Sequence, residues 1–150
     1  MPEALEWISY GAFKGCTSLK SITISESVTE IGLESFCDCI LLTSVKIPDE
    51  VTEIGHGAFS GCTDLTCINI PENVNRIDEF AFYNCSSLES INIPKSVTNI
   101  GFAAFEFCHA LTKISYSGTM TEWNAIGKDK RWNNEIPAKE VVCSDGIALL

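Results

Sequence analysis

The chain has 150 residues, of which 45% are hydrophobic and 20% are charged, so its composition is that of a folded domain and excludes a disordered segment. The formal net charge of −10 at pH 7 argues against nucleic acid and anionic membrane surfaces as partners, because both attract Lys and Arg. Every apolar run is far shorter than a membrane-spanning helix requires, so membrane insertion is not expected.

The amino terminus, Met-Pro-Glu-Ala-Leu-Glu, carries acidic residues where a signal peptide carries basic ones, and no apolar segment follows it. If the native protein is exported, we expect the export signal to be missing from this chain, which would then be a piece of a longer protein. No capping segment precedes Leu5, so we also expect the series of repeats described next to be truncated at its start.

A 23-residue repeat runs through most of the chain without insertion or deletion. Its most regular positions are a phenylalanine, a cysteine three residues later and a leucine three residues after that. The rows are Phe13, Phe36, Phe59, Phe82 and Phe105; Cys16, Cys39, Cys62, Cys85 and Cys108; and Leu19, Leu42, Leu65, Leu88 and Leu111. A fixed apolar set at this period predicts a solenoid, because one coil cannot bury its apolar edge without a neighbour.

Each repeat contains a segment of the form Leu-x-x-Ile-x-Ile, in which apolar and polar residues alternate. The alternation predicts a half-buried strand, and stacked copies are expected to form a parallel sheet with strands about 4.8 Å apart. Proline has no N–H for the sheet and therefore ends the strand in most copies. These prolines are Pro2, Pro48, Pro71 and Pro94.

Two further rows of residues mark corners of the coil. The residue before each cysteine of the row is of a type that tolerates positive φ, which predicts a left-handed turn at Gly15, Asp38, Gly61 and Asn84. Phe107 takes this position in the fifth copy, where we expect strain or a different turn. A second glycine row predicts another tight corner at Gly32, Gly55 and Gly101.

From Ser117 the repeat pattern is abandoned, and the tail predicts a cap. Thr119 or Thr121 is placed to N-cap a short helix that runs to Ile126. Large apolar side chains are expected to cover the end of the stack, as a terminal repeat must; they are Trp123, Ile126 and Trp132. The Val-Val-Cys segment 141–143 predicts a last strand. We therefore expect one domain, with five repeats and a partial amino-terminal coil over residues 1–116 and the cap over residues 117–150.

The segment from Ile93 to Leu111 contains Ile-Pro-x-Ser-Val-Thr-x-Ile-Gly, then Ala-Phe at 104–105, Cys108 and Leu111. This pattern resembles the BspA-like leucine-rich repeat, and the resemblance covers residues 1–116. The tail, with Glu122-Trp123 and later Trp132-Asn133-Asn134, also resembles the ending of bacterial members of that family. The resemblance implies an α/β fold: a right-handed, strand-rich solenoid with a parallel sheet on its concave face and short or helical turns on its convex side.

The resemblance further implies a non-catalytic binding module of a bacterial cell-surface or secreted protein. Such a module functions in adhesion and recognises a protein or glycoprotein on another cell or in the matrix. The alternative is a structural spacer in a longer surface protein that binds its partner elsewhere. The oligomeric state is left open.

The outward positions of the predicted sheet form the candidate partner-binding surface. They are small, polar and nearly uncharged, which suits hydrogen bonding to a partner without a strong electrostatic field; a merely solvated face is the alternative. The residues are Ser21, Thr23, Ser44, Lys46, Cys67, Asn69, Ser90, Asn92, Lys113 and Ser115.

Eight cysteines and two histidines are the residues with the most obvious chemical potential. The five cysteines of the repeat row are expected to be buried, because a row of five cannot pair completely and a straight row does not converge on a metal ion. Cys37 and Cys67 are expected to be exposed, with Cys67 a possible reactive thiol on the outer side of the sheet, and Cys143 lies in the cap. His56 and His109 occupy outward loop positions without a recurring Ser, Cys or carboxylate partner. We therefore expect no enzyme activity, no metal site and no cofactor.

Two other surface patterns allow more than one interpretation. Acidic residues recur in adjacent copies, and they either extend into water or attract a cation or a basic partner; the rows are Glu3, Glu26, Asp49 and Glu72, ended by Lys95, and Glu30 and Glu53, followed by Arg76. Bulky apolar residues at outward positions either pack against the next coil or mark a contact; they are Ile40, Leu41, Phe80, Phe102 and Phe107.

Overall fold

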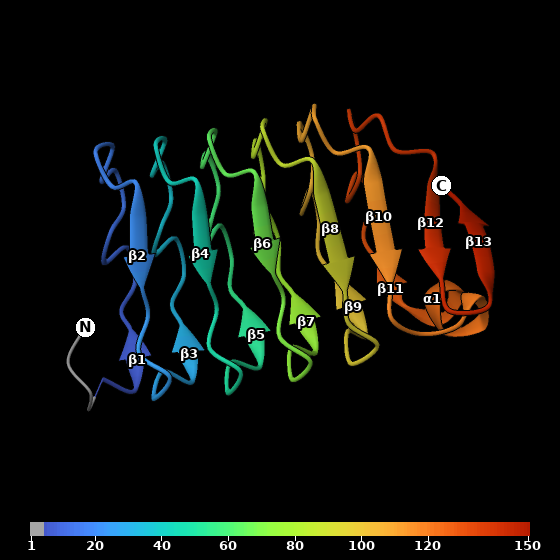
Figure 1. Ribbon diagram of the computed structural model, residues 1–150, viewed down its shortest axis with the longest axis horizontal. Coiled ribbons are helices and arrows are strands. Elements are labelled where there is room, and N and C mark those ends of the chain that lie inside the picture. Colours follow the sequence, from blue (N-terminus) through green and yellow to red (C-terminus); the bar gives the residue numbers. More distant parts are fainter. Residues whose placement is uncertain (1–4) are drawn as a thin grey trace.

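The computed structural model describes residues 5–150, so Pro2 and Glu3 lie outside the described residues. The chain winds into a series of coils stacked side by side along the longest axis of the molecule (Figure 1). Each coil contributes a strand to each of two sheets, and the apolar core lies between them. The molecule is thus a β-solenoid.

The larger sheet is built from the Leu-x-x-Ile-x-Ile segments, as predicted. Its strands run parallel and in register from one coil to the next, so that Val45 lies beside Ile22 on one side and Ile68 on the other. The strands are β2 (Ser21–Thr23), β4 (Ser44–Lys46), β6 (Cys67–Asn69), β8 (Ser90–Ile93), β10 (Lys113–Tyr116) and β12 (Glu140–Cys143), followed by the antiparallel β13 (Gly146–Leu149).

A second parallel sheet lies where the sequence predicted only short or helical turns. Its strands are two residues long, too short for apolar and polar positions to alternate, so periodicity could not reveal them. They are β1 (Trp7–Ile8), β3 (Glu30–Ile31), β5 (Glu53–Ile54), β7 (Arg76–Ile77), β9 (Asn99–Ile100) and β11 (Gly127–Lys128). Within residues 5–150 the single helix is α1 (Met120–Ala125), so the expected helical turns on the convex side are not found.

A row of stacked phenylalanine rings runs through the core along the solenoid axis. Neighbouring rings are 5.1–5.6 Å apart between centroids, with interplanar angles of 9° or less, from Phe13 to Phe105. The ring of Trp132 closes the row edge-on, 6.2 Å from that of Phe105. Each inner ring therefore contacts one ring on each side, and a repeat contributes core to both neighbours.

The positive-φ corner before each cysteine is confirmed, with φ between 56° and 73° at Gly15, Asp38, Gly61 and Asn84. Phe107 keeps the same turn at φ 64°, which is strained for a bulky residue. Sequence analysis missed a second left-handed corner four residues earlier, because glycine occupies only some of its positions: Gly11, Glu34, Gly57, Phe80 and Ala103.

The glycine row at 32, 55 and 101 has a different cause from the left-handed corners. A Cβ atom on Gly101 would lie 2.5 Å from the backbone nitrogen of Glu79 in the preceding coil. Glycine is needed there because two backbone segments approach each other closely.

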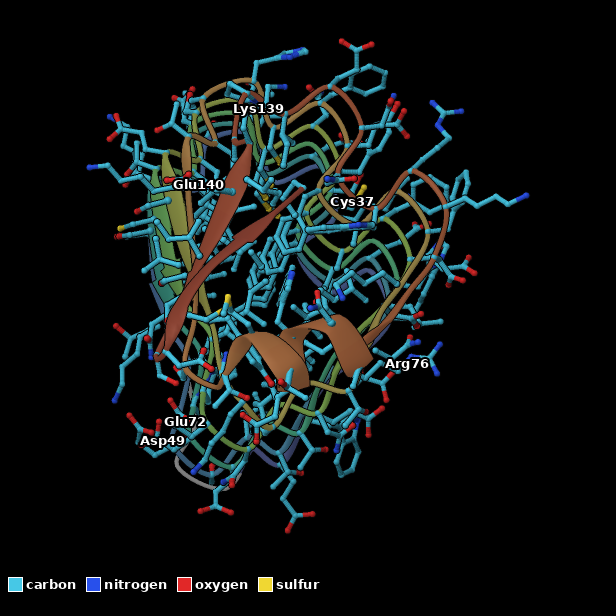
Figure 2. All side chains as sticks on the ribbon, turned by 90° about the vertical axis from the view of Figure 1, so that its right-hand side faces the viewer. Cys37, Asp49, Glu72, Arg76, Lys139 and Glu140 are labelled. Atoms are coloured by element: carbon cyan, nitrogen blue, oxygen red, sulfur yellow. The ribbon has the colours of Figure 1, made fainter. Side chains whose placement is uncertain are left out.

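The predicted cap is present, and Figure 2 shows α1 and the last two strands lying across the end of the stack. Thr119 N-caps α1 in a capping box with Glu122, whose pKa is lowered chiefly because the Thr119 backbone N–H donates to its carboxylate. Trp123, Ile126 and Trp132 are all buried. The predicted strand at 141–143 is β12, but it is not the last strand, because β13 follows it.

Both sheets continue into this tail, although the repeat pattern is lost. β11 pairs with β9 so that Gly127 lies beside Asn99, which is 28 residues earlier instead of 23. The chain therefore forms one more coil, in which the extra five residues accommodate α1. The excess is four residues by β12, where Val141 lies beside Ile114, so every later residue stays outside the repeat rows and the sequence pattern ends near Tyr116.

Candidate binding face

The structure places all ten predicted binding residues on the outward side of the larger sheet, which we call the outer face. Side chains between them, such as Val45, Ile68 and Ile91, point inward and are buried. Nine of the ten outward side chains are exposed, and Ser115 is half-buried. The alternation of the strand therefore turns one polar position in every two toward solvent over five consecutive coils.

Some polar side chains of the outer face already form hydrogen bonds within the protein. Lys46 Nζ donates to Glu26 Oε1 over 2.6 Å, and this bond raises the pKa of Lys46. Because both side chains are largely exposed, solvent screens the pair and it contributes little to stability. Near the other end, Ser115 Oγ lies 2.9 Å from Asn92 Oδ1, and Asn92 Nδ2 donates to Ser117 Oγ over 3.3 Å.

Two shallow hollows open on the outer face, where small side chains leave space between larger ones. The first has a volume of about 380 Å³ and lies over β4 and β6, between Lys46 and Asn69 and above Ser44 and Cys67. The second, of about 420 Å³, lies over β8, β10 and β12. Its rim includes Asn92, Lys113, Ser115, Glu140 and Val142, so it presents an amide, both signs of charge and an apolar group.

Sequence analysis missed the apolar end of the outer face. Val142 on β12 and Ile147 and Leu149 on β13 are 51%, 53% and 83% exposed. They lie beyond the last regular repeat, so no row of equivalent positions included them. The alternation within Gly-Ile-Ala-Leu at 146–149 was the available signal, because Ala148 between the two exposed residues is buried.

The cysteine row is a structural feature of the core, as predicted, except at its first member. Cys39, Cys62, Cys85 and Cys108 are fully buried and free, whereas Cys16 is exposed because no described coil precedes it. Each buried thiol donates to the carbonyl of the phenylalanine 26 residues earlier, over 3.1–3.2 Å. Burial raises the pKa of all four thiols, to about 11 for Cys39 and about 12 for Cys108.

The three remaining cysteines occupy different environments. Cys67 is exposed on the outer face, as predicted, and Cys143 is buried in the cap. Cys37 is half-buried, so the expectation that it is fully exposed is wrong. Burial also raises its pKa. The equivalent residues Ser60 and Tyr83 are half-buried as well.

The same repeat position is completely buried in the last copy. Glu106 is 2% exposed, and its carboxylate pairs with Arg131 and accepts a hydrogen bond from Asn134 Nδ2 over 2.9 Å. Both partners come from the additional coil in the tail. They satisfy a charge that would otherwise be costly to bury, and they fasten the cap to the last regular repeat.

The two histidines lie at outward corners and pack against aromatic rings. His56 lies 5.5 Å from the ring of Phe80, and its Nδ1 is 3.9 Å from Glu79 Oε2, a carboxylate that does not recur in other copies. His109 lies 5.9 Å from the ring of Phe107. Across residues 5–150, no group of three or more His, Cys, Asp or Glu side chains is placed to hold a metal ion.

One acidic row is partly neutralised by ion pairs, and some of the bulky outward residues pack against a neighbouring coil. Arg76 forms ion pairs with Glu53 and Asp78, at 3.7 Å and 2.9 Å. Figure 2 shows Asp49 and Glu72 together at one corner of the coil, away from Arg76. Phe80 and Phe102 are half-buried and pack edge-to-face at 5.5 Å, which supports packing against the next coil as their role. Ile40 and Leu41 stay 39% and 37% exposed.

Two parallel sheets joined by tight corners, a phenylalanine row and a polar outer face together define a leucine-rich-repeat solenoid. The family model described as a BspA-type leucine-rich repeat region matches residues 1–126 in six copies, so the chain belongs to this family. No curated protein matches the sequence. In the part of the chain that the structure describes, no helix combines the length and the apolar character needed to cross a membrane.

Solved structures of bacterial proteins resemble this chain. A leucine-rich cell surface protein from Faecalibacterium prausnitzii A2-165 is 39% identical with a TM-score of 0.82, over 87% of this chain and 34% of that protein. The leucine-rich repeat protein TpLRR of T. pallidum is 32% identical with a TM-score of 0.62, over 64% of this chain and 47% of its own. A leucine-rich repeat protein from Bacteroides ovatus ATCC 8483 shares the fold at 24% identity, with a TM-score of 0.68 and coverage of 97% and 48%. This chain thus spans from about a third to about half of their lengths.

Proposed function

We propose that this chain is a non-catalytic binding module of a bacterial cell-surface or secreted protein, and that it recognises a protein or a glycan-bearing partner through the outer face. The observation that carries the proposal is the hollow over β8, β10 and β12. It brings Asn92, Lys113 and Glu140 to the rim of one concave surface next to the exposed Val142. Convergent polar groups beside an apolar one are what orient and desolvate a ligand.

A location at the cell surface is supported by the similarity of this chain to a solved structure. The Faecalibacterium prausnitzii structure is described as a leucine-rich cell surface protein, and this chain is 39% identical to it. A net charge of −10 also suits a protein that works in solution rather than against anionic lipid.

A spacer role in a longer surface protein is the second candidate. It is favoured by the fact that this chain spans only 34% of the Faecalibacterium prausnitzii protein, which leaves most of that chain available for binding elsewhere. The two functions differ in a simple way, because a binding module retains partner affinity when the 150-residue chain is tested alone.

The outer face is tested by enlarging side chains that are exposed and point away from the core. The purified chain is applied to an array of extracellular matrix proteins and glycans, together with the double variant Asn69→Arg and Asn92→Arg. We expect the wild type to bind at least one class of partner and the double variant to lose at least about tenfold in affinity, because bulky groups in the centre of an interface prevent close packing.

The matched control is Asn75→Arg, which makes the same replacement at an exposed position next to β7 in the other sheet. This variant should bind like the wild type. Equal affinity of the wild type and the double variant would refute the outer face as the binding surface. Failure of the 150-residue chain to bind any partner on the array would favour the spacer.

A further inference from the structure

The last strand of the larger sheet leaves one edge open. β13 is the terminal strand of the sheet, antiparallel to β12, and within residues 5–150 no strand pairs with its other side (Figure 1). Such an edge carries a row of backbone donors and acceptors that another strand is able to pair with.

The pairing of β12 with β13 shows which backbone groups point to the open edge. The N–H of Leu150 donates to the carbonyl of Lys139 over 2.9 Å, so residues 139 and 150 form a hydrogen-bonded pair. Hydrogen-bonded and non-hydrogen-bonded pairs alternate along an antiparallel ladder. The N–H and C=O groups of Ile147 and Leu149 therefore point away from β12, toward the open edge.

The edge strand is short, but it lacks the side chains by which edge strands usually resist pairing. Natural edges carry charged side chains, proline or a bulge, whereas β13 reads Gly-Ile-Ala-Leu. Ile147 and Leu149 are exposed, and Val142 lies directly beside Ile147 on β12. The result is an uncharged edge flanked by an apolar patch.

The distribution of charge also favours this end of the molecule for association between copies. Residues 1–75 contain 3 Lys and Arg against 11 Asp and Glu, a net charge of −8. Residues 76–150 contain 7 against 9, a net charge of −2, and the two halves add to the −10 of the whole chain. Like-charge repulsion between two copies is therefore weakest when they meet through their carboxyl-terminal ends.

We propose that two copies of this chain associate through β13, antiparallel to each other, about a two-fold axis that passes beside Ala148. In this register Ile147 of one copy lies opposite Leu149 of the other. Both residues present their N–H and C=O groups to the open edge, so the two opposed pairs form four backbone hydrogen bonds. A two-fold axis also gives a closed dimer, in which neither copy has a second β13 edge to offer.

The side chains suit this register. The two Ala148 residues form a non-hydrogen-bonded pair at the axis, where Cα atoms approach to about 4.5 Å and a small side chain is favoured. On the outer side, the apolar surface formed by Val142 and Ile147 of one copy is extended by Leu149 of the other. The acidic residue nearest to the axis is Glu140, which lies beside Leu149 on β12. The two-fold axis places the two Glu140 residues roughly 15 Å apart and the two Asp145 residues roughly 20 Å apart, beyond the screening length in physiological salt.

The dimer is weak, because one pair of short strands buries less surface than about 1,200 Å², the lower limit for stable complexes. Sedimentation equilibrium at concentrations up to about 100 µM covers the micromolar affinities of such interfaces. We expect the weight-average mass to rise from 16.4 kDa toward twice that value as the concentration increases. A mass of 16.4 kDa at every concentration, or growth beyond the dimer, overturns the proposal.

The double variant Ile147→Lys and Leu149→Lys places charges on the edge without altering a buried residue. We expect it to remain at 16.4 kDa throughout the concentration range. The matched control is Ile40→Lys with Leu41→Lys, which removes a similar exposed apolar pair at a corner far from the cap. The control should dimerise like the wild type; equal behaviour of the two double variants contradicts pairing through β13.

The register is tested by a thiol at the axis. In a background of Cys16→Ser and Cys67→Ser, which removes the two exposed cysteines, Ala148→Cys is oxidised at high concentration. A Cα separation of about 4.5 Å lies within the range that a disulfide spans. We expect peptide mapping to find position 148 of one copy linked to position 148 of the other. No such link, at a concentration where the background protein is dimeric, contradicts the two-fold axis at Ala148.

Discussion

Phe82→Ala is expected to lower the free energy of unfolding by about 3–5 kcal/mol, which is the usual cost of emptying a buried phenylalanine site. Phe82 is fully buried and stacks on Phe59 and Phe105, at 5.6 Å and 5.2 Å between ring centroids. The change therefore removes two aromatic contacts in addition to the buried area. Chemical denaturation followed by circular dichroism measures the loss, which should also lower Tm by about 10 °C or more.

Phe13→Ala is the matched control, because it makes the same change at the beginning of the row. Phe13 stacks on Phe36 alone and is only partly buried. We expect less than half of the loss caused by Phe82→Ala. Equal losses at the two positions would contradict the view that each inner coil is stabilised from both sides.

Raising the pH from 8 to 10 is expected to lower the free energy of unfolding by about 5 kcal/mol through the four buried thiols of the row. Burial raises the pKa of all four thiols in the folded protein, to about 11 for Cys39 and about 12 for Cys108, from an ordinary value of 9.0. Between these values the unfolded chain loses protons that the folded protein keeps. Stability is thus fully present below pH 9 and declines above it, by about 1.4 kcal/mol per thiol per pH unit.

Cys85→Ala separates the contribution of the thiols to the loss of stability from that of lysine and tyrosine, which also titrate at high pH. The variant starts from a lower stability, but its loss between pH 8 and pH 10 should be smaller than that of the wild type by about a quarter, since one of four thiols is gone. Urea titrations at both pH values, with a reductant present, give the two losses. The same pH dependence in both proteins would show that the thiol row does not control alkaline stability.

The larger sheet from β2 to β10 could be predicted from the sequence, because each of these strands repeats an alternating pattern at an unbroken period of 23 residues. The smaller sheet could not, since a strand such as Glu53–Ile54 is too short to show any alternation. The tail shows a different limit. Its Thr119 cap and buried tryptophans were predicted from local chemistry, but an insertion of five residues concealed the additional coil.

For the candidate site, periodicity predicted which side chains point outward but not what lies beside them. All ten residues share the outer face, because one residue in two along a strand faces the same way. The hollow at Glu140 and Val142 joins this face only through the pairing of β12 with β10, which no sequence row indicated. The burial of Glu106 could not be predicted for a related reason: Arg131 and Asn134 reach it from a coil whose position depends on the insertion.

The central claim is that partners bind on the outer face, and Cys67 allows it to be tested without any substitution. Cys67 is exposed near the middle of this face, on β6, whereas the exposed Cys16 lies at a corner of the first coil. The measurement is the rate at which a maleimide labels each thiol, with and without a saturating partner, read by mass spectrometry. We predict that the partner slows labelling of Cys67 at least about tenfold and leaves Cys16 unchanged, since a buried interface excludes reagent and water. An unchanged rate at Cys67 under saturation would contradict the claim.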